Sequence, residues 1–267
     1  KIKLKTQPSG DVVQYFVQQD PVIIPIIETA EEGLRERVLS GIRPFDLLLG
    51  EPLYRIQIYK TPSRIYVLMD IHHIAYDGSS SIVFHRDLVK AYNGESLSKE
   101  TFTCAHFALL EAERMQGEEY KRDEAYFRQK LAGIIPAKIP ILHRSEEAAG
   151  TLDKVSEYVD YKQVSDYCKN LEISPNNLFA GALGICLNRY TRVEKFCFCT
   201  AHNGRIDERV RDVVGMFVKT LPVVVAHEPQ QNLGDYLQGI RSDMKELWSH
   251  QTYPFSDMVT NFGVTMD

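Results

Sequence analysis

The 267-residue sequence contains no long apolar run. A membrane-spanning helix needs about 20 consecutive apolar residues, and none of the apolar segments approaches that length. The sequence also has neither a recognisable signal peptide nor an Asn-x-Ser/Thr glycosylation site. We therefore expect a cytoplasmic protein with no membrane partner.

Cysteine is scarce, and its spacing excludes the usual cysteine-based sites. The five cysteines form neither a CxxC pair nor an even set: Cys104, Cys168, Cys186, Cys197 and Cys199. Disulfide frameworks and structural zinc sites show paired spacings. The sequence therefore predicts free thiols in a reducing compartment and no metal site.

An excess of basic residues is also missing. Lysine and arginine total 31 against 36 acidic residues, which gives a formal charge of −5. This balance provides no electrostatic surface for nucleic acid or anionic lipid. The hydrophobic content of 44% and charged content of 25% are those of a globular protein. We expect no nucleic-acid partner.

Strand-like and helix-like patterns are mixed in both halves of the chain, which favours the α+β class. A segment with two prolines, residues 132–150, predicts a linker between an N-terminal lobe (1–150) and a C-terminal lobe (151–267). The expected strands are Val12–Val17, Val22–Ile27, Leu53–Tyr59, Arg64–Ile71, Leu152–Val159, Glu194–Thr200 and Phe217–Ala226. Helices are expected in 28–41, after Gly78, in Thr103–Leu131, near Val164–Leu171, after Ser174 and in Leu233–His250.

The segment MDIHHIAYDGSSS (69–81) concentrates reactive side chains at the end of an apolar strand. If the strand continues, His72 and His73 point to opposite faces, so that one faces a cavity and the other faces supporting structure. Asp77 then lies in a turn, where a carboxylate can orient the site. Gly78 lacks a Cβ, which lets the chain turn into the next helix.

Other interpretations of this segment remain open from the residues alone. His72 and His73 could be hydrogen-bonded histidines of the core. A metal site lacks a third ligand at a recognisable spacing, although His85 is near. A serine nucleophile in 79–81 lacks the G-x-S-x-G turn that exposes such a residue.

Four segments, in order over about 210 residues, resemble the condensation domains of nonribosomal peptide synthetases. HHIAYDG resembles the HHxxxDG signature of that family, which belongs to the chloramphenicol-acetyltransferase-like superfamily. RPFDLLLGEPLYR, VGMFVKTLP and HQTYPF resemble three further family segments. The opening LKTQP is a weaker match. The resemblance implies a domain shortened at both ends, and we expect this piece alone to have little activity.

The resemblance implies two chloramphenicol-acetyltransferase-like lobes, each a mixed sheet flanked by helices. The lobes would form a V with the active site between them. The implied reaction joins a carrier-bound acyl or peptidyl thioester to a carrier-bound aminoacyl acceptor through an amide bond. The implied partners are carrier protein domains, whose 4'-phosphopantetheine arms hold the substrates, and adenylation domains. No intrinsic cofactor is implied.

By the same resemblance, His73 matches the second family histidine and is the candidate catalytic residue. His72, Asp77 and Gly78 are expected to support it, and the arginine that pairs with the aspartate in the family is expected upstream of the chain. Arg205 and His202 loosely match a family G-R segment, and Arg205 is either a structural residue or a tunnel or substrate contact. Thr220 is a further candidate tunnel or substrate contact.

Lys219 stands where the family usually has asparagine, and it is a further candidate substrate contact. It is either a solvated lysine on a variable loop or a cation that reaches an arm's phosphate or the donor carbonyl.

Three other functions remain open. They are a coenzyme A-dependent acyltransferase of the same superfamily, an epimerisation domain, and a non-catalytic domain that docks carriers. The RPFDL and HQTYPF segments favour the carrier-dependent branch, and no acidic segment matches the one that an epimerisation domain would need.

Overall fold

A computed structural model describes residues 2–17, 22–134, 155–226 and 230–263. Its contacts divide the chain into two compact units, each made of two segments. Unit 1 comprises Lys1–Leu110 and Arg205–Phe217, and unit 2 comprises Glu111–Gly204 and Val218–Asp267. The predicted division at residue 150 instead follows the order of the chain, and most of its linker lies outside the described residues. The lobe boundary therefore remains a prediction.

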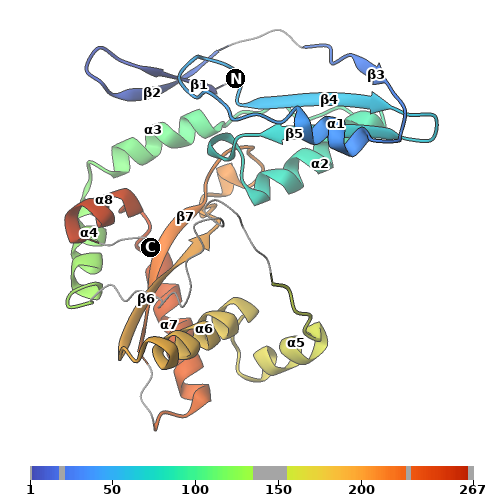
Figure 1. Cartoon of the computed structure of the whole chain (residues 1–267). Coiled ribbons are helices and arrows are strands. Elements are labelled where there is room, and N and C mark those ends of the chain that lie inside the picture. The colour runs from blue at the N-terminus through green and yellow to red at the C-terminus, as the bar shows by residue number, and fades with distance from the viewer. Residues whose placement is uncertain (1, 18–21, 135–154, 227–229, 264–267) are drawn as a thin grey trace, which may run out of the picture. The chain divides into compact units, whose positions relative to one another are not determined.

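Unit 1 contains a mixed β-sheet and a separate β-hairpin (Figure 1). In the sheet, β4 pairs with β3 in parallel and with β5 in antiparallel orientation. The β4–β5 hairpin confirms two predicted strands, and the Thr61 N–H donates to the Arg64 carbonyl across the turn, at 2.8 Å. The strand bounds are β1 Ile2–Thr6, β2 Val12–Phe16, β3 Ile26–Glu28, β4 Tyr54–Lys60 and β5 Ile65–Ile71.

Two predicted strands differ from the structure. The run Val22–Ile27 forms a strand only from Ile26 onward. Pro25 has no N–H to donate to a neighbouring strand, so the ladder begins directly after it. In the second case, Leu152–Val159, residues 155–159 are described and form no strand.

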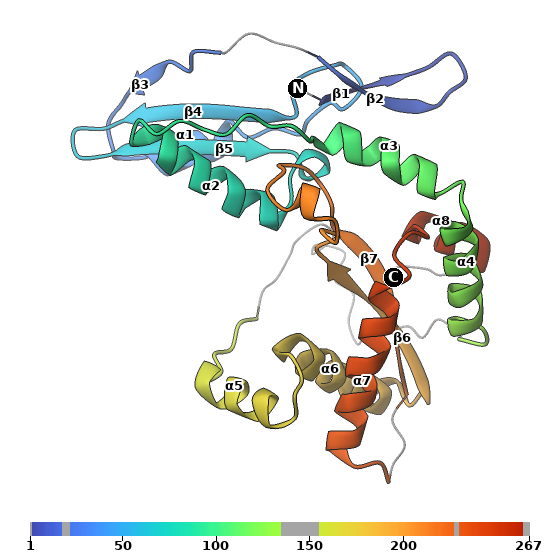
Figure 2. The same ribbon diagram turned by 180° about the vertical axis from the view of Figure 1, so that it is seen from behind.

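Two helices of unit 1, α1 (Leu34–Ser40) and α2 (Gly78–Tyr92), lie along the sheet. A cluster of buried apolar side chains joins the two chain segments of the unit. Figures 1 and 2 show α1 and α2 beside β4 and β5. Residues 205–217 contain the short 3-10 helix η3 (Glu208–Val210) and pack against the start of α3 (Cys104–Arg114). The rings of Phe107 and Phe217 meet edge to face, with centroids 5.2 Å apart.

Unit 2 is built on an antiparallel pair of strands, β6 and β7. Its α6 helix begins as predicted: the Ser174 hydroxyl accepts the Asn177 N–H, the Asn177 side chain accepts the Ser174 N–H, and Pro175 stands in the first turn. Figures 1 and 2 show α4 and α8 side by side. The bounds are α4 Glu118–Lys130, α5 Tyr161–Asn170, α6 Pro175–Thr191, β6 Lys195–His202, β7 Lys219–Ala226, α7 Leu233–Trp248 and α8 Phe255–Phe262.

The core of unit 2 lies between α6, α7 and the β6–β7 pair. Its fully buried side chains include Leu221, Val225, Leu237 and Met244. Two glycines of α6 allow α7 and β7 to approach closely. A Cβ placed on Gly184 would lie 2.7 Å from the Tyr236 hydroxyl and 3.0 Å from the Val225 Cβ.

All five cysteines lie in the described residues as free thiols, as predicted. No helix in the described ranges combines the length and the apolar composition of a membrane span.

Gly184→Ala should destabilise the protein by about 1–3 kcal/mol, because the added methyl group overpacks a helix contact. Urea unfolding measures the change. Gly239→Ala is the matched control: Gly239 is also helical, but a Cβ there meets nothing within 4 Å. The free energy of unfolding of that variant should rise by roughly 0.5–1 kcal/mol, because alanine has a higher helix propensity than glycine. Equal midpoints for the two variants would contradict the packing argument.

Candidate active site

The two histidines of the HHxxxDG segment have different environments, although the strand does not continue through them. β5 ends at Ile71, and the His72 N–H donates to the Leu53 carbonyl at 2.9 Å. The half-buried His72 ring then caps a short 3-10 turn, where its Nδ1 accepts the Ile74 N–H at 3.1 Å. His73 begins that turn and is exposed. Its imidazole has no recorded hydrogen bond to the part of the chain that the structure describes.

The RPFDL segment packs against the His72 ring. The Phe45 ring meets the His72 ring edge to face, with centroids 5.7 Å apart. The Arg55 guanidinium lies 3.8 Å from the centre of the Phe45 ring and donates to the Arg43 carbonyl at 2.6 Å. Arg55 also forms an ion pair with Asp70 at 2.8 Å. This segment therefore holds the His72 backbone and ring in place.

Asp77 is the N-cap of α2, and its carboxylate is completely buried. Oδ1 accepts the Ser80 N–H at 2.7 Å and an Arg205 Nη2 hydrogen at 2.9 Å. Oδ2 accepts the Phe217 N–H at 3.1 Å. Burial alone would raise the pKa of Asp77, but these hydrogen bonds outweigh it and hold the pKa below its usual value. The group is therefore a buried carboxylate anion at neutral pH.

Arg205 is the arginine partner of Asp77, and it belongs to this chain. The expectation that the partner lies upstream is therefore wrong. The Arg205 side chain is 5% exposed, and its Nη1 donates to the Val210 and Val213 carbonyls at 2.6 and 2.7 Å. Its guanidinium also lies 4.4 Å from the centre of the Phe217 ring. These contacts support the structural role that the sequence also suggested for Arg205, and its assignment as a substrate contact stays a prediction.

The bond to Asp77 also explains where β7 begins. The predicted strand started at Phe217, but the structure has β7 starting at Lys219. Because the Phe217 N–H is bonded to the Asp77 carboxylate, it does not take part in a strand ladder.

Gly78 opens α2 and is exposed. Its backbone does not require glycine, since its φ lies outside the left-handed region, and an added Cβ would meet nothing within 4 Å. The prediction that the turn itself needs a residue without Cβ is therefore wrong. The space beside Gly78 is open in the described residues.

Lys219 and Thr220 are half-buried residues at the start of β7, opposite His202 and Ala201 of β6. The Lys219 ammonium forms an ion pair with the Glu111 carboxylate of α3. The interpretation of Lys219 as a solvated residue on a variable loop is therefore wrong. Within unit 2 it is a strand residue with a carboxylate partner.

His202 is held in a neutral form by its surroundings in unit 2. Its Nδ1 accepts the Gly204 N–H at 3.2 Å, and its ring lies 5.2 Å from the Trp248 ring. Burial lowers the pKa of His202 below its usual value, opposed in part by a hydrogen bond with Gln251. A proton on Nδ1 would face the Gly204 N–H, so protonation costs this hydrogen bond.

The HQTYPF segment of unit 2 forms a turn that is bonded to the buried Asp123. The His250 Nδ1 lies 2.9 Å from the Asp123 Oδ1, and the Thr252 N–H donates to the Asp123 Oδ2 at 3.0 Å. Asp123 is fully buried, as is Tyr253. The predicted last helix therefore stops at Trp248, because His250 is part of this turn.

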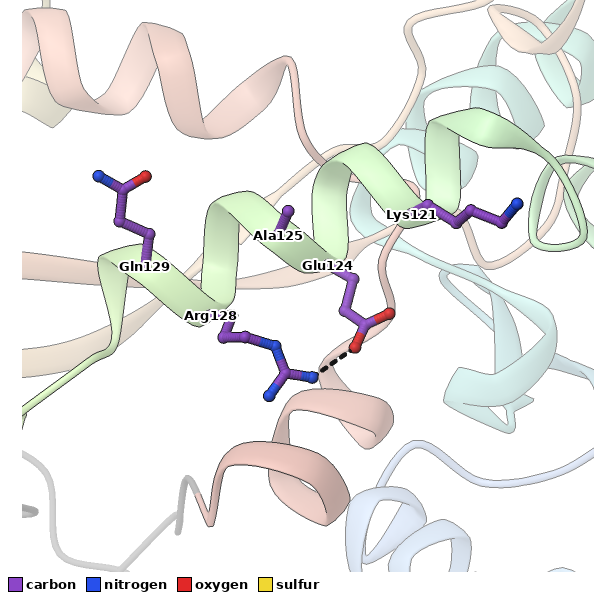
Figure 3. Close-up of a pocket in the computed structure, with 5 residues that line it drawn as sticks. All are labelled: Lys121, Glu124, Ala125, Arg128 and Gln129. Carbon is purple, nitrogen blue, oxygen red and sulfur yellow. Dashed lines mark hydrogen bonds and ion pairs between the residues drawn. The ribbon is translucent and has the colours of Figure 1, made fainter.

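A surface pocket of about 460 Å³ lies on α4 (Figure 3). Its lining residues are Lys121, Glu124, Ala125, Arg128 and Gln129. The cations are already paired: Arg128 with Glu124 at 2.6 Å, and Lys121 with Glu118 at 2.8 Å. None of the lining residues belongs to the predicted site. The described ranges also hold no group of three His, Cys, Asp or Glu side chains suited to a metal ion.

Comparison with known proteins identifies the family to which the chain belongs. The family model Condensation domain matches residues 1–267. The chain belongs to the condensation domain family. It is 28% identical to bacitracin synthase 1 of Bacillus licheniformis, over 97% of its length, and 26% identical to tyrocidine synthase 2 of Brevibacillus parabrevis, over 96%. It spans only 5% and 7% of those relatives.

Solved structures show the same fold. The complex of the X-domain and OxyB from teicoplanin biosynthesis matches with a TM-score of 0.83 at 21% identity, over 100% of this chain and 62% of that one. The first condensation domain of the calcium-dependent antibiotic synthetase matches with a TM-score of 0.76 at 16% identity, over 100% and 66%. The predicted family, the α+β class and the chloramphenicol-acetyltransferase-like fold are therefore confirmed. The V-shaped arrangement of the lobes remains a prediction.

Within unit 1 of this condensation domain, the structure joins three of the predicted site residues: Asp77 and Gly78 at the start of α2, and Arg205 through the ion pair. Sequence reasoning missed Ser80 and Asp123. Ser80 had a local signal, because a residue three places after an aspartate N-cap often takes part in capping. Asp123 had none, because it stands among charged residues of a helix.

Asp77→Ala should destabilise the domain by about 3–5 kcal/mol, because it leaves the buried Arg205 guanidinium without its counter-charge. Thermal and urea unfolding measure the loss. Glu28→Ala is the control, since it removes an ion pair between two exposed side chains, Glu28 (77% exposed) and Lys60 (53% exposed), and should cost about 1 kcal/mol or less. An Asp77→Ala variant that unfolds like wild type would show that the pair does not stabilise the fold.

His202 should make stability depend on pH. Because its folded pKa is depressed, its contribution is fully present above about pH 6.5, the usual value, and is lost as pH falls through the lower folded pKa. Asn at this position keeps an acceptor for the Gly204 N–H but does not titrate. From pH 8 to pH 5, the urea midpoint of wild type should therefore fall relative to that of His202→Asn. A difference independent of pH would contradict this assignment.

Proposed function

We propose that this condensation domain joins a carrier-bound acyl or peptidyl thioester to a carrier-bound aminoacyl acceptor in a nonribosomal peptide synthetase. The observation that carries the proposal is the exposed imidazole of His73 on a turn anchored at both ends. The relatives named above are synthases of bacitracin and tyrocidine, which supports this substrate class. Carrier and adenylation domains are the partners that the proposal requires, and the cytoplasm is its location.

The reaction needs a nucleophilic amine, a thioester carbonyl and a leaving thiol. The acceptor nitrogen forms a bond to the carbonyl carbon, the tetrahedral intermediate collapses, and the C–S bond breaks. The amine loses one proton, and the donor arm leaves as a thiol. His73 is the group that accepts or hydrogen-bonds that proton, which typically contributes about 10²–10⁴-fold. Orienting two tethered substrates can contribute up to about 7–11 kcal/mol.

The other predicted residues have supporting places in this proposal. His72 and Asp77 fix the backbone on either side of His73, and the open space beside Gly78 leaves room for substrate. Thr220 and Lys219 stay candidate contacts to substrate or arm. A phosphate bound by Lys219 would have to compete with Glu111 for the ammonium.

A coenzyme A-dependent acyltransferase is the second candidate. One solved structure with this fold, the starter condensation domain of rhizomide synthetase, is a complex with C8-CoA (TM-score 0.78, 17% identity). The chain itself favours carrier-bound donors, because its net charge of −5 offers no general attraction for the several phosphates of coenzyme A.

In the full-length synthetase with loaded carriers, His73→Ala should lower the rate of amide formation by about 10²-fold or more. Its melting temperature should stay unchanged, because the imidazole is exposed. His85→Ala is the control: His85 is also exposed, but its Nδ1 is bonded to the Ser81 carbonyl of its own helix at 2.7 Å. That variant should keep the wild-type rate.

Two outcomes would overturn the proposal. A His73→Ala enzyme that turns over like the His85→Ala enzyme would remove the catalytic assignment and favour a docking domain. Equal or better kcat/KM for the same acyl group on coenzyme A than on a carrier would favour the acyltransferase.

A further inference from the structure

Ser80 lies at the centre of the network that anchors α2, although no predicted role was attached to it. Its side chain is 0% exposed. Its Oγ has four polar neighbours: the Asp77 Oδ1 at 2.8 Å, the Gly215 carbonyl at 2.8 Å, the Gly215 N–H at 3.0 Å and the Arg205 Nη2 at 3.0 Å. One hydroxyl therefore links the first turn of α2 to two residues of the distant segment 205–217, Arg205 and Gly215.

The single hydroxyl hydrogen can be assigned by counting donors. Two neighbours, the Gly215 amide and the Arg205 guanidinium, can only donate, so the Oγ accepts from both. The Asp77 Oδ1 already receives hydrogens from the Ser80 amide and from Arg205. For the Gly215 carbonyl, the Ser80 hydroxyl is the donor recorded in the described residues. The hydrogen therefore points to Gly215, where it satisfies a buried acceptor.

In this orientation the Ser80 hydroxyl accepts the Gly215 N–H and donates to the Gly215 carbonyl, so both backbone polar groups of this residue are satisfied. Asp77 holds the amide of Phe217 two residues further on. Gly215 also has no room for a side chain, because an added Cβ would lie 2.8 Å from the Cys104 Cβ. The first turn of α2 and residues 215–217 are thus held together by two side chains on one helical turn.

These contacts fix one of the two ends of the segment that carries His73. The first end is fixed where β5 stops, by the bond from the His72 amide to Leu53 and by the His72 cap. The second end is fixed at Asp77 and Ser80. Between them, the Tyr76 N–H donates to the His73 carbonyl at 3.2 Å. Asp77 lies only four residues after His73, so a shift of the second end would move the backbone that carries His73.

We propose that Ser80 is a positioning residue, whose hydroxyl holds the backbone of residues 73–77 in the geometry that the His73 imidazole needs for amide formation. This inference rests on the proposed function. The Ser80 hydroxyl does not touch the reacting atoms, since it is fully buried among protein groups. Its effect on the rate acts through His73.

The test is a double-mutant cycle in the full-length synthetase, measured as single-turnover amide formation with loaded carriers. Ser80→Ala should lower the rate by about 10-fold or more, because small misplacements of a catalytic group are costly. In the His73→Ala background the same change should lower the residual rate by less than about 2-fold, because the positioned group is gone. Ser79→Ala is the control, since no side-chain hydrogen bond of Ser79 is recorded in the described part, and it should match wild type.

An equal loss from Ser80→Ala in both backgrounds would overturn the inference, as would no loss in either. Ser80→Cys, with a weak thiol donor of similar shape, should give a rate between wild type and Ser80→Ala. If neither variant folds, as judged by thermal melting, Ser80 determines folding and not positioning, and the inference is again wrong. If His73→Ala is as active as wild type, the proposed function fails. If only the Ser80 variants match wild type, this inference fails alone.

Discussion

One buried carboxylate, that of Asp77, connects segments of the chain that lie more than a hundred residues apart. An anion in the interior is costly unless every lone pair meets a donor. Here the donors come from the start of its own helix, from Arg205 and from the Phe217 amide. Because the donors belong to both segments of unit 1, the charge is tolerated only when the start of α2 and residues 205–217 are both in place. The cost of burial thus selects one arrangement of unit 1.

The residues of the family motifs fall into two groups: those that hold the backbone in place, and His73, whose side chain is exposed. Most motif residues hold backbone: His72 caps a turn, Arg55 and Phe45 support that turn, and His250 bonds to a buried aspartate in unit 2. His73 is the exception, because its imidazole is exposed on a turn whose ends are held by hydrogen bonds. An exposed side chain on an anchored backbone suits the catalytic role that we propose for His73.

The sequence predicted the elements whose formation depends on neighbouring residues, such as hairpins and helix caps. The β4–β5 hairpin and the capped start of α6 follow from alternation, a turn and a Ser-Pro pair, and both are confirmed. The partner of Asp77 and the start of β7 were predicted wrongly for a shared reason. Both depend on a contact that spans 128 or 140 residues, and no spacing in a single sequence reports such a contact.

The ion pair between Lys219 and Glu111 has a consequence for sequence change. Asparagine, the residue that the resemblance leads us to expect at position 219, would leave the partly buried Glu111 carboxylate without its cation. Replacing Glu111 alone would leave the ammonium unpaired in the same way. Each substitution should therefore be tolerated better in the presence of the other, and we expect the two positions to be energetically coupled. Among related domains, an acidic residue at the position of Glu111 should therefore co-vary with a basic residue at the start of β7.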